Sequence, residues 1–347
     1  MARFVSSPET FLVEELPAYL PSGTGEHTFV WIEKRELTTW DAVNALARRL
    51  GVAPRDIGCA GLKDKHAITR QWLSIPRVTP ETALAAGDEQ LRVLRAEPHG
   101  NKLRTGHLRG NRFEVVLTEL APGEAQQLAE RLAVLARDGL PNRYGDQRFG
   151  RDGDNVARGI ALLRGQRRER DARRKRLWLS SVQSAVFNEV LRARTEGQLL
   201  RQVLAGDVLQ KAGSGGVFVT EDPARDQPRL DAGEIVTTGP MPGGWAKEPP
   251  PATAARALED AALATIGVTR EELAGERDLP GTRRPLLVPV TDACAVEPPA
   301  PDATALRIAF TLPAGTYATV LVEALGVSRE PAAGQPNSPS EESMLTN

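Results

Sequence analysis

The chain has 347 residues, with 44 Lys and Arg against 45 Asp and Glu, and only two cysteines. Its 41% hydrophobic and 26% charged residues are typical of a globular protein that is long enough for one large domain or two moderate ones. The cysteines lack disulfide or metal-ligand spacing and no apolar stretch is long enough to span a bilayer. We therefore expect a cytoplasmic protein without a structural zinc and without contact with a membrane.

The first half of the sequence predicts short strands that alternate with helices. Two strands with a glycine-containing turn are expected over 10–34, and an amphipathic helix is expected to begin at Thr39 and end at Gly51. The next predicted elements are strands over 71–75 and 112–118 and a helix over 125–137. These elements lack the regular repeat of a doubly wound parallel fold, so we predict an α+β fold.

The second half is more helical. Helices are expected over 156–163, 177–196, 252–265 and 317–325, and strands over 286–290 and 305–312, with short strands and turns between 206 and 244. The final 20 or so residues are rich in Pro, Ser, Gly and Glu, and this composition predicts a disordered tail.

Positive charge is concentrated in two segments. Between Arg143 and Arg176 there are 12 basic and 5 acidic residues, whereas the chain from Glu221 onward has 10 basic and 19 acidic ones. A second basic cluster consists of Lys102, Arg104, Arg109 and Arg112. Phosphate contacts are the simplest use for such clusters, and solvated helix faces are the alternative.

The motifs of nucleotide hydrolases, zinc proteases and esterases are absent from the sequence, which leaves these activities without support. The densest polar cluster surrounds Asp64, whose neighbours include Lys63, Lys65, His66 and Arg70. Nearby positive charge favours the ionised carboxylate, which makes Asp64 a candidate nucleophile or electrostatic partner. The alternative is a loop residue paired with one of these neighbours.

A second polar cluster, over 141–150, alternates aromatic residues with Arg, Asn and Gln beside glycines. A flipped base needs a stacking ring, amide groups and guanidinium groups, and this segment offers all three. Tyr144 and Phe149 could equally be core residues beside a turn. Asn111, before Arg112 and Phe113, is a similar candidate with the same alternative.

The sequence resembles the TruD family of tRNA pseudouridine synthases from about residue 10 to 325. The resemblance rests on the motifs GTGEHTFVWIEK, AGLKDKHAITRQW, LRGNRFEVVL, NRYGDQRFGRDGDN, WLSSVQSAVFNEVL, TTGPMPG and FTLPAGTYATVLVEAL. It implies a pseudouridine-synthase catalytic domain, a mixed β-sheet with a cleft, that is interrupted by an inserted α/β TRUD domain. The implied parts are a catalytic segment over 1–154, the inserted domain over 155–285, returning catalytic strands over 286–327 and a tail over 328–347.

The resemblance also implies an isomerase that converts a uridine, at position 13 in the D arm of tRNA, to pseudouridine without a metal or organic cofactor. Asp64 matches the family's catalytic aspartate, and Tyr144 would stack on the target base. The other expected substrate-binding residues are Asn142, Gln147, Arg148, Lys63, Lys65 and Asn111. The expected partner is tRNA, no protein partner is implied, and the expected oligomeric state is a monomer. The alternative is a non-catalytic RNA-binding or chaperone protein on the same scaffold.

Overall fold

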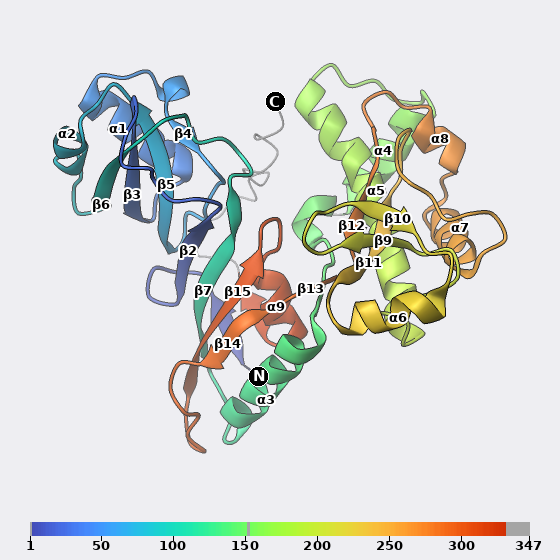
Figure 1. The fold of residues 1–347 in the computed structure, drawn as a ribbon. Coiled ribbons are helices and arrows are strands. Elements are labelled where there is room, and N and C mark those ends of the chain that lie inside the picture. The colour runs from blue at the N-terminus through green and yellow to red at the C-terminus, as the bar shows by residue number, and fades with distance from the viewer. Residues whose placement is uncertain (1, 151–152, 331–347) are drawn as a thin grey trace. The chain divides into compact units, whose positions relative to one another are not determined.

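The structure, a computed structural model, describes residues 2–150 and 153–330, and for residues 146–147 and 329–330 the backbone alone (Figure 1). It divides into two compact units. Among the described residues, the first unit joins 2–140 to 289–330, and the second covers Pro141–Val288. The second unit is thus wider than the inserted domain expected over 155–285, because it includes the polar cluster over 141–150.

The first unit is built on a mixed sheet. Its strands, in spatial order, are β14 (Thr291–Ala295), β15 (Ala305–Pro313), β7 (Leu108–Thr118), β2 (Phe11–Pro17), β5 (Ile68–Pro76), β3 (His27–Arg35) and β6 (Leu91–His99). Three shorter strands join it, namely β1 (Arg3–Val5), β4 (Gly58–Cys59) and β16 (Ser328–Glu330). Strands β2 and β5 are parallel, and so are β1 and β16, whereas the other neighbours are antiparallel. The expected α+β fold with a mixed sheet is confirmed.

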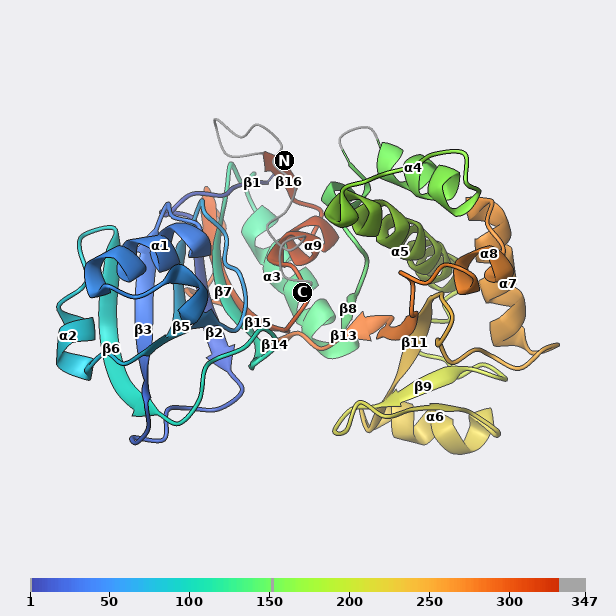
Figure 2. The same ribbon diagram turned by 90° about the horizontal axis from the view of Figure 1, so that it is seen from above.

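Helices pack against this sheet in two groups. Helices α1 (Thr39–Leu50) and α2 (Pro80–Leu84) cover β3, β5 and β6, where Val43 and Leu46 share a buried core with Ile32 and Leu73 (Figure 1). Helices α3 (Glu124–Asp138) and α9 (Ala318–Ala324) lie beside the β7, β14 and β15 part (Figure 2). A 3-10 helix, η1 (Pro54–Asp56), precedes β4.

Helix α1 shows how its ends are fixed by local chemistry. The hydroxyl of Thr38 accepts a hydrogen bond from the Asp41 backbone at 3.0 Å, and the Asp41 carboxylate accepts one from the Thr38 backbone at 2.9 Å. Gly51 ends the helix in the left-handed conformation at φ 67°. The N-terminal cap is therefore Thr38, one residue before the expected Thr39. The Thr39 hydroxyl instead binds Lys63 and Gln71.

The second unit surrounds one long helix, α5 (Ala172–Glu196). Around it lie the sheet β10 (Val217–Val219), β9 (Val208–Lys211), β11 (Ile235–Met241) and β12 (Thr282–Pro285) and the helices α4 (Asp154–Leu163), α6 (Pro223–Asp231), α7 (Ala254–Ile266) and α8 (Arg270–Ala274) (Figures 1 and 2). The remaining elements are the strand pair β8 (Leu140–Pro141) and β13 (Leu287–Val288) and the 3-10 helix η2 (Asp146–Phe149).

Helix α5 begins five residues before the expected start at 177. The Asp171 side chain accepts hydrogen bonds from the backbone of Arg173 and Arg174, so an aspartate cap starts the helix within the arginine-rich segment. The buried face that the sequence indicated, Val182, Val186 and Val190, is confirmed.

Two other expectations need correction at the C-terminal end. The strand expected over 286–290 is only Leu287–Val288. The tail expected from 328 does not begin there, because Ser328–Glu330 pair with β1 as a strand. The remainder of that expected tail, residues 331–347, lies outside the described residues.

Candidate active site

Asp64 lies in the loop between β4 and β5, and buried polar side chains hold the backbone of this loop. The Thr39 hydroxyl accepts a hydrogen bond from the Lys63 backbone at 2.9 Å and donates one to Gln71 at 3.0 Å. The Gln71 amide in turn donates to the Gly61 carbonyl oxygen at 3.1 Å. Thr39 and Gln71 are both fully buried. A buried network whose members are paired is rigid, so the loop has a defined position on β5.

Lys34 of β3 adds the strongest anchor. Its side chain is fully buried, and its ammonium nitrogen donates hydrogen bonds to the carbonyl oxygens of Leu37, Lys63 and Asp64 at 2.5, 3.3 and 2.9 Å. A buried ammonium needs several acceptors to offset its lost hydration, and hydrogen bonds from a charged donor are stronger than neutral ones. Lys34 thereby fixes the backbone of Asp64 itself.

Lys63 points into the protein. Its ammonium nitrogen lies 2.7 Å from the carboxylate of Glu15 on β2, and both side chains are buried. The other carboxylate oxygen of Glu15 accepts a hydrogen bond from the Trp72 backbone at 3.2 Å. The Lys63 ammonium, expected at the substrate, is thus occupied by a protein carboxylate and ties the loop to β2.

The side chains of Asp64 and Lys65 are exposed. Within residues 2–150 and 153–330 neither side chain has a hydrogen bond or ion pair. Hydrogen bonding by Thr38 lowers the pKa of Asp41 at the start of α1, and the positive charges of Lys65 and Lys34 act in the same direction. The loop therefore presents one accessible carboxylate, on a fixed backbone, in a locally positive field.

Asn111 on β7 is brought to this loop by its strand pairing. It lies opposite Glu15 of β2, whose carboxylate binds Lys63 of the loop, and paired residues of neighbouring strands project from the same face. The side-chain oxygen of Asn111 is buried and has no hydrogen-bond partner among the described residues. An unpaired buried acceptor is costly and so calls for an explanation, which a ligand donor would supply.

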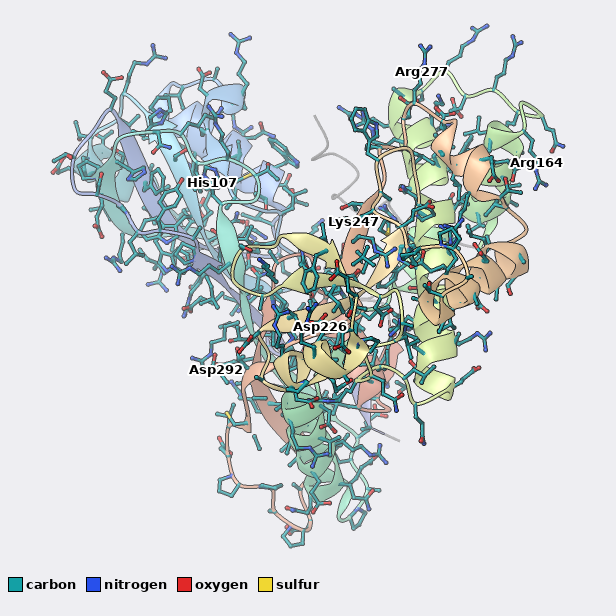
Figure 3. All side chains as sticks on the ribbon, turned by 45° about the vertical axis from the view of Figure 1, so that its right-hand side comes forward. His107, Arg164, Asp226, Lys247, Arg277 and Asp292 are labelled. Atoms are coloured by element: carbon teal, nitrogen blue, oxygen red, sulfur yellow. The ribbon has the colours of Figure 1, made fainter. Side chains whose placement is uncertain are left out.

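The basic cluster over 102–112 adjoins the same loop. The Gly106 backbone donates a hydrogen bond to the carbonyl oxygen of Ala60 at 2.9 Å. His107, labelled in Figure 3, lies in the turn before β7. Its Nδ1 atom is 2.6 Å from the Tyr19 hydroxyl oxygen, within hydrogen-bond distance. Arg104 and Arg109 are exposed, and neither forms an ion pair in the described part of the chain. The first unit thus brings exposed guanidinium groups to the segment that packs against the Asp64 loop.

The second unit holds the other expected site residues, and Asn142 is buried in it. Its side-chain amide donates to the Pro285 carbonyl oxygen at 2.9 Å, its side-chain oxygen accepts from Arg284, and its backbone donates to Leu286 at 2.9 Å. These contacts join the segment after β8 to the one that contains β12 and β13.

Tyr144 packs against the core of the second unit. The guanidinium carbon of Arg284 lies 4.3 Å from the centre of its ring, and Phe187 meets the ring edge to face at 5.7 Å. Its hydroxyl donates to the sulfur of Met241 at 3.6 Å. The Tyr144 backbone N–H donates to the side-chain oxygen of Asn188 at 2.8 Å, and the Asn188 side-chain amide donates to the Tyr144 carbonyl oxygen at 2.9 Å. The ring thus packs against the core beside a turn while Tyr144 stays half-buried, and its stacking on a base stays a prediction.

Arg148 is half-buried, with its Nε atom 3.3 Å from the Ser184 hydroxyl and its guanidinium 5.6 Å from the ring of Tyr144. The side chain of Gln147 lies outside the described residues. The structure thus gathers Lys63, Asp64, Lys65 and Asn111 in one unit and Asn142, Tyr144 and Arg148 in the other.

In residues 2–150 and 153–330, no group of three or more His, Cys, Asp or Glu side chains is arranged to hold a metal ion. Among the same residues, no helix has the length and apolar character that a membrane crossing needs.

The fold and the site define a two-unit α+β protein that presents an exposed aspartate on a rigid loop beside exposed arginines. The sequence model of the family described as "tRNA pseudouridine synthase D (TruD)" matches residues 2–170 and 168–325. The chain therefore belongs to the TruD family of tRNA pseudouridine synthases, as the motifs indicated.

Individual relatives agree with this assignment. Proteins named tRNA pseudouridine synthase D from Anaeromyxobacter dehalogenans and Thermus thermophilus are 44% and 42% identical, over 92% and 91% of this chain and 91% and 86% of theirs. A crystal structure of a putative tRNA pseudouridine synthase D from Methanosarcina mazei has the same fold, with a TM-score of 0.72 and 22% identity over 92% of each chain.

Proposed function

We propose that the protein isomerises a uridine of tRNA to pseudouridine, with Asp64 as the catalytic carboxylate. The observation that carries this proposal is the state of Asp64, whose side chain is exposed and unpaired while Lys34 and the buried Lys63–Glu15 pair fix its loop. A group that must meet a reacting carbon needs both access and a defined position. The relatives named tRNA pseudouridine synthase D support the same reaction.

The reaction explains why one carboxylate suffices. The bond between C1′ of the ribose and N1 of the uracil breaks, the freed uracil turns, and a new bond joins C1′ to C5, after which the C5 proton leaves. The Asp64 carboxylate supports this sequence either by adding to C1′ or by assisting proton removal at C2′. The target nucleotide must leave the base stack to bring C1′ to Asp64.

Other exposed groups of the first unit would bind the RNA. Lys65, Arg104 and Arg109 are available to phosphate groups, which attract such cations at long range. The unpaired side-chain oxygen of Asn111 would accept a hydrogen bond from the uracil N3–H, which presents the base edge to the site. We assign the buried Lys63 and Asn142 to support of the site rather than to contact with RNA, whereas the half-buried Tyr144 keeps its expected role of stacking on the target base.

The expected target is the uridine at position 13 in the D arm of tRNA, in the cytoplasm where tRNA is modified. The test is pseudouridine mapping at single-nucleotide resolution on unmodified tRNA transcripts, with the wild type beside Asp64→Asn. We expect the wild type to modify one D-arm uridine, and the variant to bind the transcript equally well and form no product.

The outcomes separate the candidates. Equal modification by both proteins would remove Asp64 from the chemistry. Binding of tRNA without product from the wild type would instead favour a non-catalytic RNA-binding protein. Modification at another uridine would leave the reaction standing and reject position 13.

A further inference from the structure

Trp245 is the most exposed large apolar side chain described, with 87% of its surface open to solvent. It lies in the segment between β11 and α7 of the second unit. Tryptophan is the side chain with most to gain from burial, so an exposed tryptophan on a fixed backbone is a candidate contact for a ligand.

The backbone around Trp245 is fixed rather than frayed. The backbone of Gly244 donates to the Leu279 carbonyl oxygen at 3.1 Å, and that of Trp245 donates to the Pro280 carbonyl oxygen at 2.6 Å. A Cβ atom at Gly243 would lie 2.4 Å from the same Leu279 oxygen, so only glycine allows the two segments to approach this closely. The indole is thus presented on a rigid support, which reduces the entropic cost of binding.

The segment 276–280, whose last two residues accept the hydrogen bonds from Gly244 and Trp245, also contacts the basic end of α5. Glu276 and Asp278, which precede Leu279, receive the ammonium group of Lys175 at 3.4 and 2.5 Å. Lys175 lies in the first turn of α5, and Figure 3 shows Arg277 beside one end of that helix.

This end of α5 is strongly cationic. Seven basic and two acidic residues lie between Arg167 and Arg176. Four arginines here are exposed and form no ion pair with any residue that the structure describes: Arg168, Arg170, Arg173 and Arg277. Unpaired guanidinium groups that repel one another are a cost to the folded protein, and an anionic ligand would offset that cost.

We propose that Trp245 stacks on an unpaired base of the tRNA, while the exposed arginines at the start of α5 and Arg277 bind the adjoining phosphates. Single-stranded RNA is the ligand class that presents aromatic faces and phosphates together, and an aromatic ring beside cationic side chains is how proteins bind it. This inference rests on the proposed function, because it takes tRNA as the substrate, and it adds a second contact away from Asp64 in the sequence and on the other unit.

The experiment compares Trp245→Ala and Trp245→Phe with the wild type, and uses Leu20→Ala as a matched control. Leu20 is a large apolar residue that is 64% exposed on the first unit. The dissociation constants of an unmodified tRNA transcript, a single-stranded oligouridylate and an RNA duplex are measured over a range of salt concentrations, beside the rate of pseudouridine formation.

We expect Trp245→Ala to weaken binding of tRNA and oligouridylate about 5- to 100-fold, Trp245→Phe to lose less, and Leu20→Ala to match the wild type. Duplex binding and the salt dependence should not change with Trp245→Ala, since no charge is removed. Arg173→Ala should reduce the slope of log K against log salt by about 1.

Unchanged binding by Trp245→Ala, with an active wild type, would overturn this inference and leave the proposed function intact. Loss of duplex binding in equal measure would overturn base stacking. A wild type that neither binds nor modifies tRNA would overturn both. Unchanged tRNA binding together with loss of self-association or of a protein partner would assign Trp245 to a protein interface instead.

Discussion

The ammonium nitrogen of Lys34 lies 2.9 Å from the backbone carbonyl oxygen of Asp64, so a fully buried lysine holds the backbone of the residue whose side chain is exposed. The two residues belong to different elements of the first unit, β3 and the loop before β5. The Lys34 ammonium group thus binds the backbone of Asp64 and not its carboxylate, which stays available for a reaction.

Replacement of Lys34 by methionine should therefore lower the rate of pseudouridine formation without a matching loss of tRNA affinity. Methionine keeps the apolar stem but removes the donor to three carbonyl oxygens. A displacement of about 1 Å in a reacting group can cost about 100-fold in rate, and we expect a fall of that order. Single-turnover kinetics at saturating tRNA would measure it.

Lys65→Met is the matched control, since it removes the same charge from an exposed neighbour without touching the loop backbone. It should weaken tRNA binding and reduce the salt slope by about 1, with a smaller effect on the single-turnover rate. If the two variants behaved alike, Lys34 would act through its charge and not through the loop.

The sequence predicted Asp64 but not its supports. Local composition makes Asp64 a candidate, because its basic neighbours adjoin it along the chain, and the family resemblance predicts its catalytic role. Lys34 and Glu15 lie 30 and 48 positions away from the loop residues that they bind, and an isolated Lys or Glu within a strand carries no signal of such a contact. Only the sheet order, with β2 and β3 on either side of β5, brings them to the loop.

Tyr144 illustrates a choice that the local sequence leaves open. Alternating aromatic and polar residues predict either a stacking surface or a core residue, and the choice depends on what covers the ring. Here Arg284, 140 residues later, and Phe187 of α5 pack against the half-buried ring. Periodicity within ten residues cannot report such distant neighbours. The bounds of helix α1 and its glycine end depend on adjacent residues, and the sequence predicted them to within one residue.

Breaking the Glu15–Lys63 pair should destabilise the protein strongly. Glu15→Gln would leave the buried Lys63 ammonium without its carboxylate, and removal of one partner of a buried pair costs about 3–5 kcal/mol. The double variant Glu15→Gln with Lys63→Met should cost less than the single one, since no charge stays buried. Urea denaturation of the three proteins would measure these free energies.

The exposed pair Arg95 and Glu97, at 2.5 Å, serves as the comparison in the same unit. Glu97→Gln should cost no more than about 1 kcal/mol, because solvent screens such pairs. A loss from Glu15→Gln as small as that from Glu97→Gln would contradict a structural role for the buried pair.

The two cysteines should differ in their reaction with alkylating reagents. Burial raises the pKa of the Cys59 thiol to about 11, and the negative charge of Glu15 acts in the same direction, whereas Cys294 is exposed. A raised pKa lowers the thiolate fraction at pH 8, so Cys59 should react about 100-fold more slowly than an ordinary thiol. Its rate should rise about tenfold per pH unit and level off only near pH 11.

The same shift has a consequence for stability. Below pH 8 the thiol is protonated in both the folded and the unfolded chain and has no effect. Between the ordinary thiol pKa and about 11 only the unfolded chain loses the proton, so the free energy of unfolding falls as the pH rises. Cys59→Ser should remove this loss. Equal alkylation of both cysteines at pH 8, measured by peptide mass spectrometry, would contradict the assigned environment of Cys59.

Asn111 should show opposite effects on activity and on stability. Its buried side-chain oxygen lacks a partner in the part of the chain that the structure describes, so Asn111→Ala removes an uncompensated polar group and should leave the free energy of unfolding within about 1 kcal/mol of the wild type or raise it. If that oxygen receives a hydrogen bond from the target base, the same variant should lose about 10- to 100-fold in the rate of pseudouridine formation. Thermal unfolding and single-turnover kinetics on the same preparations separate the two effects. A variant that is destabilised by several kcal/mol and fully active would show that the Asn111 side chain serves the fold and not the substrate.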